Sequence, residues 1–241
     1  ATKLGFNTQP TILTDANYGE VYYWYSAGKS LRLVPANRLF DYGINLNPLP
    51  TDPYPPKDVI IKSAQSFLSK SILPADSSTE FDSLSFARPT IEGVETVTEE
   101  ESSFAIVNFT EKINDLKIVN ETVEIGTINI SVARNLTVLS VYADLISTPT
   151  VLQEIPTKSF SDLVNDISRS QLLSLGGGKI DVLAVASSDI KKVVVEKTSV
   201  AYYKANINKS SLLQPVFILS GRAIFNNGSV VSALLYLTAA K

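Results

Sequence analysis

Residues 21–34 read VYYWYSAGKSLRLV, and this stretch shows most directly what the chain is built from. Two runs of aromatic, β-branched and aliphatic residues, 21–25 and 31–34, flank a short segment that contains Gly28. This pattern predicts two antiparallel strands joined by a short turn. We therefore expect a β-hairpin at residues 21–34.

Four consecutive aromatic residues in this hairpin form the most interesting candidate surface: Tyr22, Tyr23, Trp24 and Tyr25. Side chains alternate along a strand, so Tyr22 and Trp24 share one face, while Tyr23 and Tyr25 share the other with Val21. We expect one face to belong to the core. The other face then presents aromatic rings to a glycan, a peptide or a partner protein. A strand covered on both sides is nevertheless the favoured interpretation, because large aromatic residues are usually highly buried.

The segment after the hairpin predicts a helix followed by strands. Pro55 and Pro56 stand where a helix can begin, and apolar residues then recur at helical spacing over 57–70. That apolar stripe consists of Ile60, Ala64, Phe67 and Leu68. Strands are expected at 105–109, 118–125, 128–132 and 136–143, from β-branched composition and partial alternation.

The last third of the chain repeats this order of elements. Ser159 and Asp162 have the spacing of a capping box, which predicts a second helix that continues to the glycines at 176–178. Its buried stripe is expected to be Phe160, Leu163, Ile167 and Leu172. Strands are expected at 192–203, 214–222 and 230–238, with a tight turn at 226–229 before the last one.

These elements predict an α+β fold with antiparallel sheets, each packed by a helix. Residues 1–150 are expected to hold the N-terminal hairpin plus the first helix-and-sheet half, and residues 151–241 the second half. The two halves share only the order of their elements, because no repeat is visible at the level of residues.

Composition excludes much catalytic chemistry. The 241 residues include no histidine, no cysteine and no methionine. Ser-His-Asp triads, Cys-His pairs and typical zinc sites all require the missing residue types. We therefore expect no catalytic residue, no cofactor and no metal. The net charge is −3, and the 21 Lys and Arg residues form no basic stripe, so nucleic acid is not an expected partner.

Three short motifs point to chemistry at first sight, and each has a simpler interpretation. Residues 176–179 read GGGK, but a phosphate loop would need glycine at 173 and Ser or Thr at 180, where Leu and Ile stand, so a helix stop is favoured. Ser-x-x-Lys occurs at 26–29 and 188–191, both at expected turns, where chance explains it. The acidic run at 99–101 lacks the shaped loop of a calcium site and is typical of a solvated face.

Several segments resemble a known family: 1–10 (ATKLGFNTQP), 23–24 (YW), 64–68 (AQSFL), 107–109 (VNF), 113–116 (INDL), 200–203 (VAYY) and 212–217 (LLQPVF). They resemble a family of membrane-anchored surface proteins of candidate-phyla (Patescibacteria-type) bacteria. The resemblance implies that this region lies outside the cytoplasmic membrane, anchored through a membrane span and a Pro-rich linker upstream of it. It carries no catalytic motif.

The helix-then-sheet halves are also similar to PepSY-like domains and to the YycH/YycI extracytoplasmic regulators of a cell-wall sensor kinase. This second likeness implies two PepSY/YycI-like halves. Taken together, we expect a non-catalytic extracytoplasmic interaction or regulatory domain whose partner is an envelope protein or a peptide. One alternative is a self-assembling cell-surface or appendage subunit that associates through strand edges. Another is an enzyme that uses a pair of carboxylates.

Overall fold

A computed structural model of the chain describes residues 1–47, 49–73, 78–120, 127–146, 154, 156–177, 180–207 and 210–240. The chain forms two compact units. Unit 1 comprises Ala1–Lys112, Ile125–Ser147 and Asn206–Ser211, and unit 2 comprises Ile113–Glu124, Thr148–Ala205 and Leu212–Lys241. Each unit has its own sheet, called sheet A in unit 1 and sheet B in unit 2.

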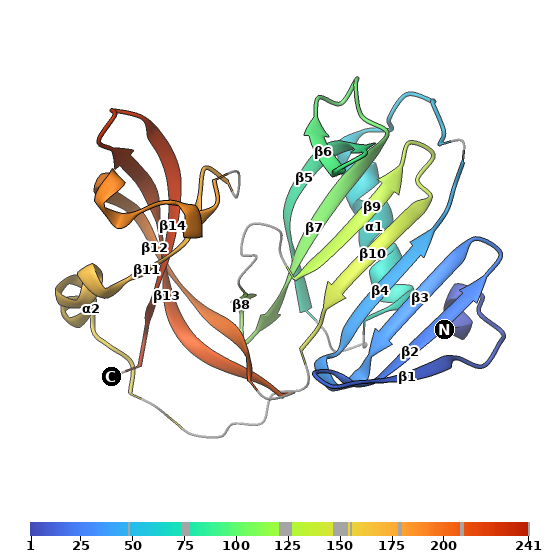
Figure 1. The fold of residues 1–241 in the computed structure, drawn as a ribbon, viewed down its shortest axis with the longest axis horizontal. Helices are drawn as coiled ribbons and strands as arrows, with labels where there is room; N and C mark the ends of the chain where they lie inside the picture. Colours follow the sequence, from blue (N-terminus) through green and yellow to red (C-terminus); the bar gives the residue numbers. More distant parts are fainter. Residues whose placement is uncertain are drawn as a thin grey trace. The chain divides into compact units, whose positions relative to one another are not determined.

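Sheet A is antiparallel throughout, with the strand order β1-β2-β3-β4-β10-β9-β7-β5-β6 (Figure 1). Its strands are β1 (Thr11–Asp15), β2 (Gly19–Ser26), β3 (Lys29–Val34), β4 (Leu39–Ile44), β5 (Ser78–Thr90), β6 (Gly93–Val97), β7 (Phe104–Ile113), β9 (Ile128–Ala133) and β10 (Val138–Asp144). The first four strands form a meander, and β10 continues it on the far side of β4.

The predicted hairpin at 21–34 is confirmed as β2 and β3. Ser26 pairs with Lys29, which leaves Ala27 and Gly28 as the two residues of the turn. Both have positive φ, 44° and 77°, the backbone twist that matches a two-residue hairpin loop. Glycine adopts this conformation without steric cost, and its presence at Gly28 sets the register of every pair along the two strands.

Helix α1 (Lys57–Ser71) confirms the predicted helix and lies behind the strands of sheet A in Figure 1. Ile60, Ala64 and Leu68 are at most 1% exposed, because the four-residue spacing places all three on the stripe that faces the sheet. They pack in one core with apolar residues of the sheet such as Val107 and Ile130. Burial of each Ile or Leu side chain contributes about 1.5–3 kcal/mol, so this face of the sheet is firmly covered.

Sheet B has the strand order β8-β12-β13-β14-β11. Its strands are β8 (Leu116–Val119), β11 (Gln171–Leu175), β12 (Ile190–Ile207), β13 (Ser210–Phe225) and β14 (Val230–Thr238). β8 and β12 are parallel, whereas β13–β14 and β14–β11 are antiparallel. The strands expected at 192–203, 214–222 and 230–238 are confirmed, and so is the turn between the last two.

The remaining elements are short helices. α2 (Phe160–Asp166) begins with the predicted capping box, in which the Ser159 hydroxyl accepts from the Asp162 backbone N–H at 3.2 Å. The Asp162 carboxylate in turn accepts from the Ser159 backbone N–H at 2.9 Å. Single turns of 3₁₀ helix occur at Thr2–Leu4, Pro35–Asn37, Ile167–Arg169, Val182–Ala184 and Ser187–Asp189.

The expected fold class, α+β with two PepSY/YycI-like halves in which a helix packs each sheet, is wrong. In the described part of the chain, strands account for 55% of the residues and helices for 17%, with only two α-helices and a mixed sheet. β1, β4, β5 and β11 add strands in segments where no clear alternation indicates one. Pairing stabilises such strands, with the distant strands β10 and β14 for β4 and β11, and local propensity alone cannot show this.

The extent of the second helix is also corrected. α2 ends at Asp166, and Leu172 belongs to strand β11 instead of a helical stripe. Gly176 and Gly177, with φ of 61° and 70°, follow that strand and do not end a helix. Leu172 packs on the core through its pairing with Leu235 of β14, a contact set by the sheet and not by helical periodicity. Of the strand expected at 118–125, residues 121–125 lie outside the described residues.

Candidate interaction surface

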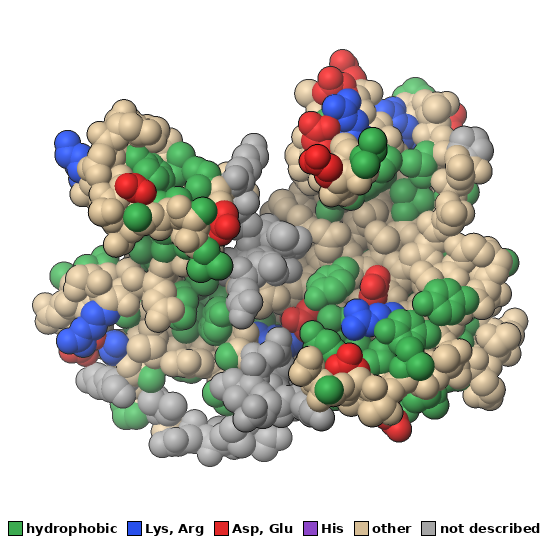
Figure 2. All heavy atoms as spheres, viewed as in Figure 1, with side chains coloured by type: hydrophobic (Ala, Val, Ile, Leu, Met, Phe, Trp, Pro, Cys, Tyr) green, Lys and Arg blue, Asp and Glu red, His purple; other side chains and the backbone are tan. Residues whose placement is uncertain are grey.

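The two faces of sheet A differ in what covers them. One face carries α1 and the N-terminal residues Leu4 and Phe6, which belong to its core. The other face is turned toward the viewer in Figures 1 and 2 and carries no helix of unit 1. We call the latter the open face.

Tyr22 and Trp24 lie on the helix-bearing side and are committed to contacts within the chain. The Trp24 ring Nε1–H donates to the carbonyl of Thr8 at 3.1 Å, and the ring packs against the core. Tyr22 stacks on Trp24 with ring centroids 6.2 Å apart, and its hydroxyl donates to a Glu20 carboxylate oxygen at 2.6 Å. These two aromatic side chains therefore stabilise the fold on the helix-bearing face and are not part of the open face.

Tyr23 and Tyr25 share one face, as the alternation along the strand predicts, and that face is the open face. Their rings are parallel within 3°, with centroids 6.4 Å apart, and Tyr25 is 68% exposed. Val21, the third residue on this face, is only 2% exposed. The aromatic surface thus runs from the half-buried Tyr23 to the exposed Tyr25, toward the hairpin turn.

Strand register places further functional groups beside Tyr23. Tyr23 pairs with Arg32, Arg32 with Asp41, and Asp41 with Tyr142. Directly paired residues share one face of a sheet, and neighbouring strands lie about 4.8 Å apart. We call this line across β2, β3, β4 and β10 the open-face row: Tyr23, Arg32, Asp41 and Tyr142.

Beyond Tyr142, the same line of paired residues continues across the sheet with polar side chains that hydrogen-bond to one another. The Asn129 side-chain amide N–H donates to the Asn108 side-chain oxygen at 2.7 Å. Asn108 in turn donates to the Ser83 hydroxyl at 2.9 Å. These polar groups satisfy one another, whereas the open-face row has no comparable network among the described residues.

In the described part of the chain, Arg32 and Asp41 form no ion pair with each other, and one donor of Arg32 has no hydrogen-bond acceptor. The guanidinium Nε of Arg32 is buried and has no hydrogen-bond acceptor among the described residues. Asp41 lies directly opposite on β4, and in this part of the structure the two form no ion pair. A buried donor without a partner is costly. Arg32 as a whole is only half-buried and Asp41 is exposed, so charged groups from outside the chain can pair with the remaining guanidinium and with the carboxylate.

Burial and the charges of the open-face row change the pKa of the Tyr142 hydroxyl. Burial raises the pKa of its hydroxyl most, and the carboxylates of Asp144 and Asp41 and the nearby Tyr18 raise it further. The Arg32 guanidinium opposes them and lowers the pKa. The phenol therefore stays neutral at physiological pH and can donate a hydrogen bond. Tyr142 is 46% exposed, so its ring remains available at the surface.

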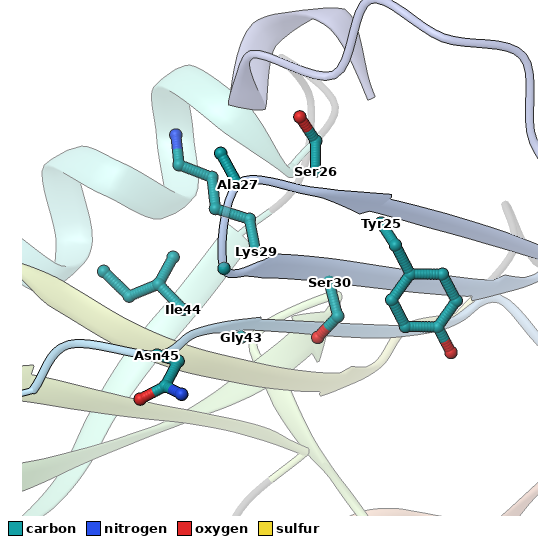
Figure 3. A pocket seen from close by; sticks show the side chains of 9 residues that line it. Tyr25, Ser26, Ala27, Lys29, Ser30, Gly43, Ile44 and Asn45 are labelled. Carbon is teal, nitrogen blue, oxygen red and sulfur yellow. The ribbon is translucent and has the colours of Figure 1, made fainter.

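A shallow hollow of about 740 Å³ lies at the hairpin end of the open face. Figure 3 shows the Tyr25 ring, the Ser30 hydroxyl and the Asn45 amide on one side of the strands, while Lys29 points away from them. Gly43 lies between Ser30 and Asn45 and has no side chain to fill the space. The hollow thus combines one aromatic wall with hydroxyl and amide groups.

Other motifs singled out in the sequence contribute little here. Ser188 lies in a 3₁₀ turn and Lys191 in β12, and the GGGK segment extends beyond the described residues. In the acidic turn, the backbone carbonyls of Glu99 and Glu100 accept hydrogen bonds from the Arg134 guanidinium. No group of three or more Asp or Glu side chains in the described ranges is arranged to hold a metal ion. Within those ranges, no helix is long and apolar enough to span a membrane.

No protein-family model, no curated protein and no solved structure matches this chain. The candidate surface is therefore defined by geometry alone. Sequence reasoning found Tyr23 and Tyr25 but missed Arg32, Asp41 and Tyr142. The one local signal was a charged residue between two leucines in the run LRL at 31–33, which marks a side chain that faces away from the core.

Proposed function

We propose that the chain is a non-catalytic interaction domain that binds a protein partner through the open face of sheet A. The observation that carries this proposal is the open-face row, in which the half-buried Tyr23 and the exposed Tyr142 flank a cation and an anion that form no ion pair within the described structure. Consistent with the family resemblance, we place the domain on the extracytoplasmic side of a bacterial envelope.

The chemistry of the open face suits protein recognition. Figure 2 shows hydrophobic side chains gathered around basic and acidic groups on this face. Tyr and Arg are enriched at the centres of protein interfaces, because they combine a large contact area with directional hydrogen bonds. Arg32 and Asp41 lie side by side, so the row has no net charge to attract a polyanion. A partner with its own paired charges and apolar rings fits these properties.

Site-specific photo-crosslinking tests the proposal. A photo-reactive phenylalanine analogue placed at position 25 should form a protein adduct when the chain is present in its native envelope. The same analogue at Lys62 on the exposed side of α1, whose side chain is 77% exposed, is the matched control and should form none. Arg32→Glu should abolish the adduct at position 25. Equal adducts at both positions, or none at position 25, would contradict the proposal.

A second candidate function, a self-assembling surface subunit, is supported by the exposed edge strand β1. Ile12 and Leu13 on this strand are 52% and 54% exposed, and within the described residues β1 pairs with β2 alone. An open apolar edge can add a strand from another chain. The strand has only five residues and ends in Asp15, features that limit edge-to-edge growth, so this candidate ranks second. It predicts polymers that lengthen with concentration, and Ile12→Lys should stop their growth.

A further inference from the structure

We infer that the partner bound by the open face of sheet A is a second copy of this chain, related by a two-fold axis. This inference rests on the proposed function and names its partner. It follows from the order of side chains along two neighbouring lines of the sheet and from the charges that they carry.

The open-face row is self-complementary. Its order across the four strands is aromatic, cation, anion, aromatic. A two-fold axis that runs between β3 and β4, parallel to the strands, reverses this order in the opposing copy. Arg32 then faces the partner subunit's Asp41, and Tyr23 faces the partner subunit's Tyr142. An isologous interface requires this reciprocity, in which each surface matches itself after a half-turn.

The next line toward the hairpin turn fits the same axis by shape. It consists of Tyr25, Ser30, Gly43 and Ser140 on the same four strands. The half-turn places the large Tyr25 ring against the partner subunit's small Ser140, and Ser30 against the partner subunit's Gly43. Large residues opposite small ones interdigitate across packed sheets. The hollow over Ser30 and Gly43 is the space that such packing uses.

The charges favour a second copy over other occupants. Within one chain, the Arg32 Nε has no acceptor among the described residues. The partner subunit's Asp41 supplies a carboxylate that can pair with the terminal amino groups of the Arg32 guanidinium, since Arg32 as a whole is only half-buried. A phosphate-rich ligand would meet the Asp41 carboxylate beside Arg32 and be repelled. Two reciprocal ion pairs therefore form in the dimer without leaving any charge of the row unpaired.

Charge reversal with mixing tests this arrangement in the full chain. Sedimentation velocity should show a reversible monomer–dimer equilibrium for the unmodified chain. Arg32→Glu alone sets two carboxylates against each other across the interface, and Asp41→Arg alone sets two guanidinium groups together. Each change should weaken self-association at least about tenfold. The control variants Lys62→Glu and Asp58→Arg on exposed α1 should leave it unchanged.

The mixture of the two single variants decides the question. Arg32→Glu mixed with Asp41→Arg should form a heterodimer, because both cross-interface pairs are then again opposite in charge. Rescue also shows that each variant is folded. A mixture that stays monomeric, or an unmodified chain that stays monomeric at every concentration, would overturn the inference. The crosslinking experiment at position 25 then distinguishes failure of the dimer inference from failure of the proposed function. An adduct with a different protein supports the proposed function, and the absence of any adduct overturns it.

Discussion

Gly221 in β13 occupies a position that leaves no room for a side chain. A β-carbon added there would lie 1.9 Å from the backbone carbonyl oxygen of Val194 and 2.9 Å from its carbonyl carbon. Moving β12 and β13 apart to make room for the β-carbon would break backbone hydrogen bonds between them. The steric clash therefore cannot be relieved without a loss of stability. The close approach of β13 to β12 therefore depends on this glycine.

We predict that Gly221→Ala lowers the free energy of unfolding by about 2–3 kcal/mol, as overpacking does in well-packed interiors. Urea unfolding followed by circular dichroism measures the change. Gly43→Ala is the matched control: its β-carbon would meet only the Ser30 hydroxyl, at 3.4 Å, and should cost far less. Equal losses for the two variants would show that the β12–β13 contact is looser than described.

Tyr142 allows the charges of the open-face row to be read directly. Asp41 raises the pKa of its phenol and Arg32 lowers it. Asp41→Asn should therefore move this pKa down, and Arg32→Gln should move it up. The ¹³Cζ resonance of labelled Tyr142, followed against pH in dilute protein, measures both shifts. A pKa that responds to neither substitution would place the two charges farther from Tyr142 than the strand register implies.

The raised pKa of Tyr142 also sets the sign of a pH effect on stability. The folded state favours the neutral phenol, because its pKa lies above the ordinary tyrosine value of about 10. The contribution is fully present below about pH 10 and is lost as pH rises through the raised pKa. Tyr142→Phe should therefore reduce the alkaline loss of stability and leave the stability near pH 7 little changed.

At the scale of elements, the Arg134 side chain fastens three loops of unit 1 together. Its guanidinium donates to the backbone carbonyls of Asp52, Glu99, Glu100 and Ser102, at 3.3, 3.2, 3.4 and 2.8 Å. The group also stacks on the Tyr54 ring, 4.4 Å from its centroid. A planar guanidinium with five donors can serve all of these partners at once, which an ammonium group cannot.

Arg134→Lys should therefore lower the free energy of unfolding by about 2 kcal/mol although the charge is kept. Arg88→Lys is the control, because Arg88 makes an exposed ion pair with Glu95 at 2.9 Å and such pairs contribute about 0–1 kcal/mol. Proteolysis of the 98–103 turn provides a second readout and should speed up in Arg134→Lys alone. If both lysine variants behave alike, Arg134 does not fasten the loops.

The elements that sequence reasoning found are those with a strong local signal. The β2–β3 hairpin has runs of aromatic, β-branched and aliphatic residues on both sides of a glycine turn, and α1 has an apolar stripe at helical spacing. β11 shows why other elements were missed. Its residues QLLSL continue the apolar spacing of the preceding helix, and only the pairing with β14 reveals a strand.

The candidate surface follows the same logic. That Tyr23 and Tyr25 share one face could be predicted, because alternation is a local property of a strand; which face lies on the core could not. Tyr142 joins Arg32 across a separation of 110 positions in the sequence, through the pairing of β10 with β4. Register between distant strands depends on the whole sheet, so no local pattern assigns Tyr142 to this surface.

At the scale of the whole molecule, the absence of histidine makes a prediction about pH. Histidine is the one side chain whose ordinary pKa lies between pH 5 and 8. The 241 residues contain none, so self-association and stability should stay constant between about pH 6 and 8. Sedimentation velocity and urea unfolding at three pH values check this. A sharp change within the window would show that a carboxylate with a strongly raised pKa takes part.

The open face of sheet A as a self-association surface is tested most directly by nuclear magnetic resonance of tyrosine-labelled protein over a dilution series. We predict that the resonances of Tyr23, Tyr25 and Tyr142 shift together with concentration, along one monomer–dimer curve. Tyr22 and Tyr54 contact groups within the chain and should stay in place. Shifts confined to Tyr22 and Tyr54, or no shift over the whole series, would contradict the assignment of the open face.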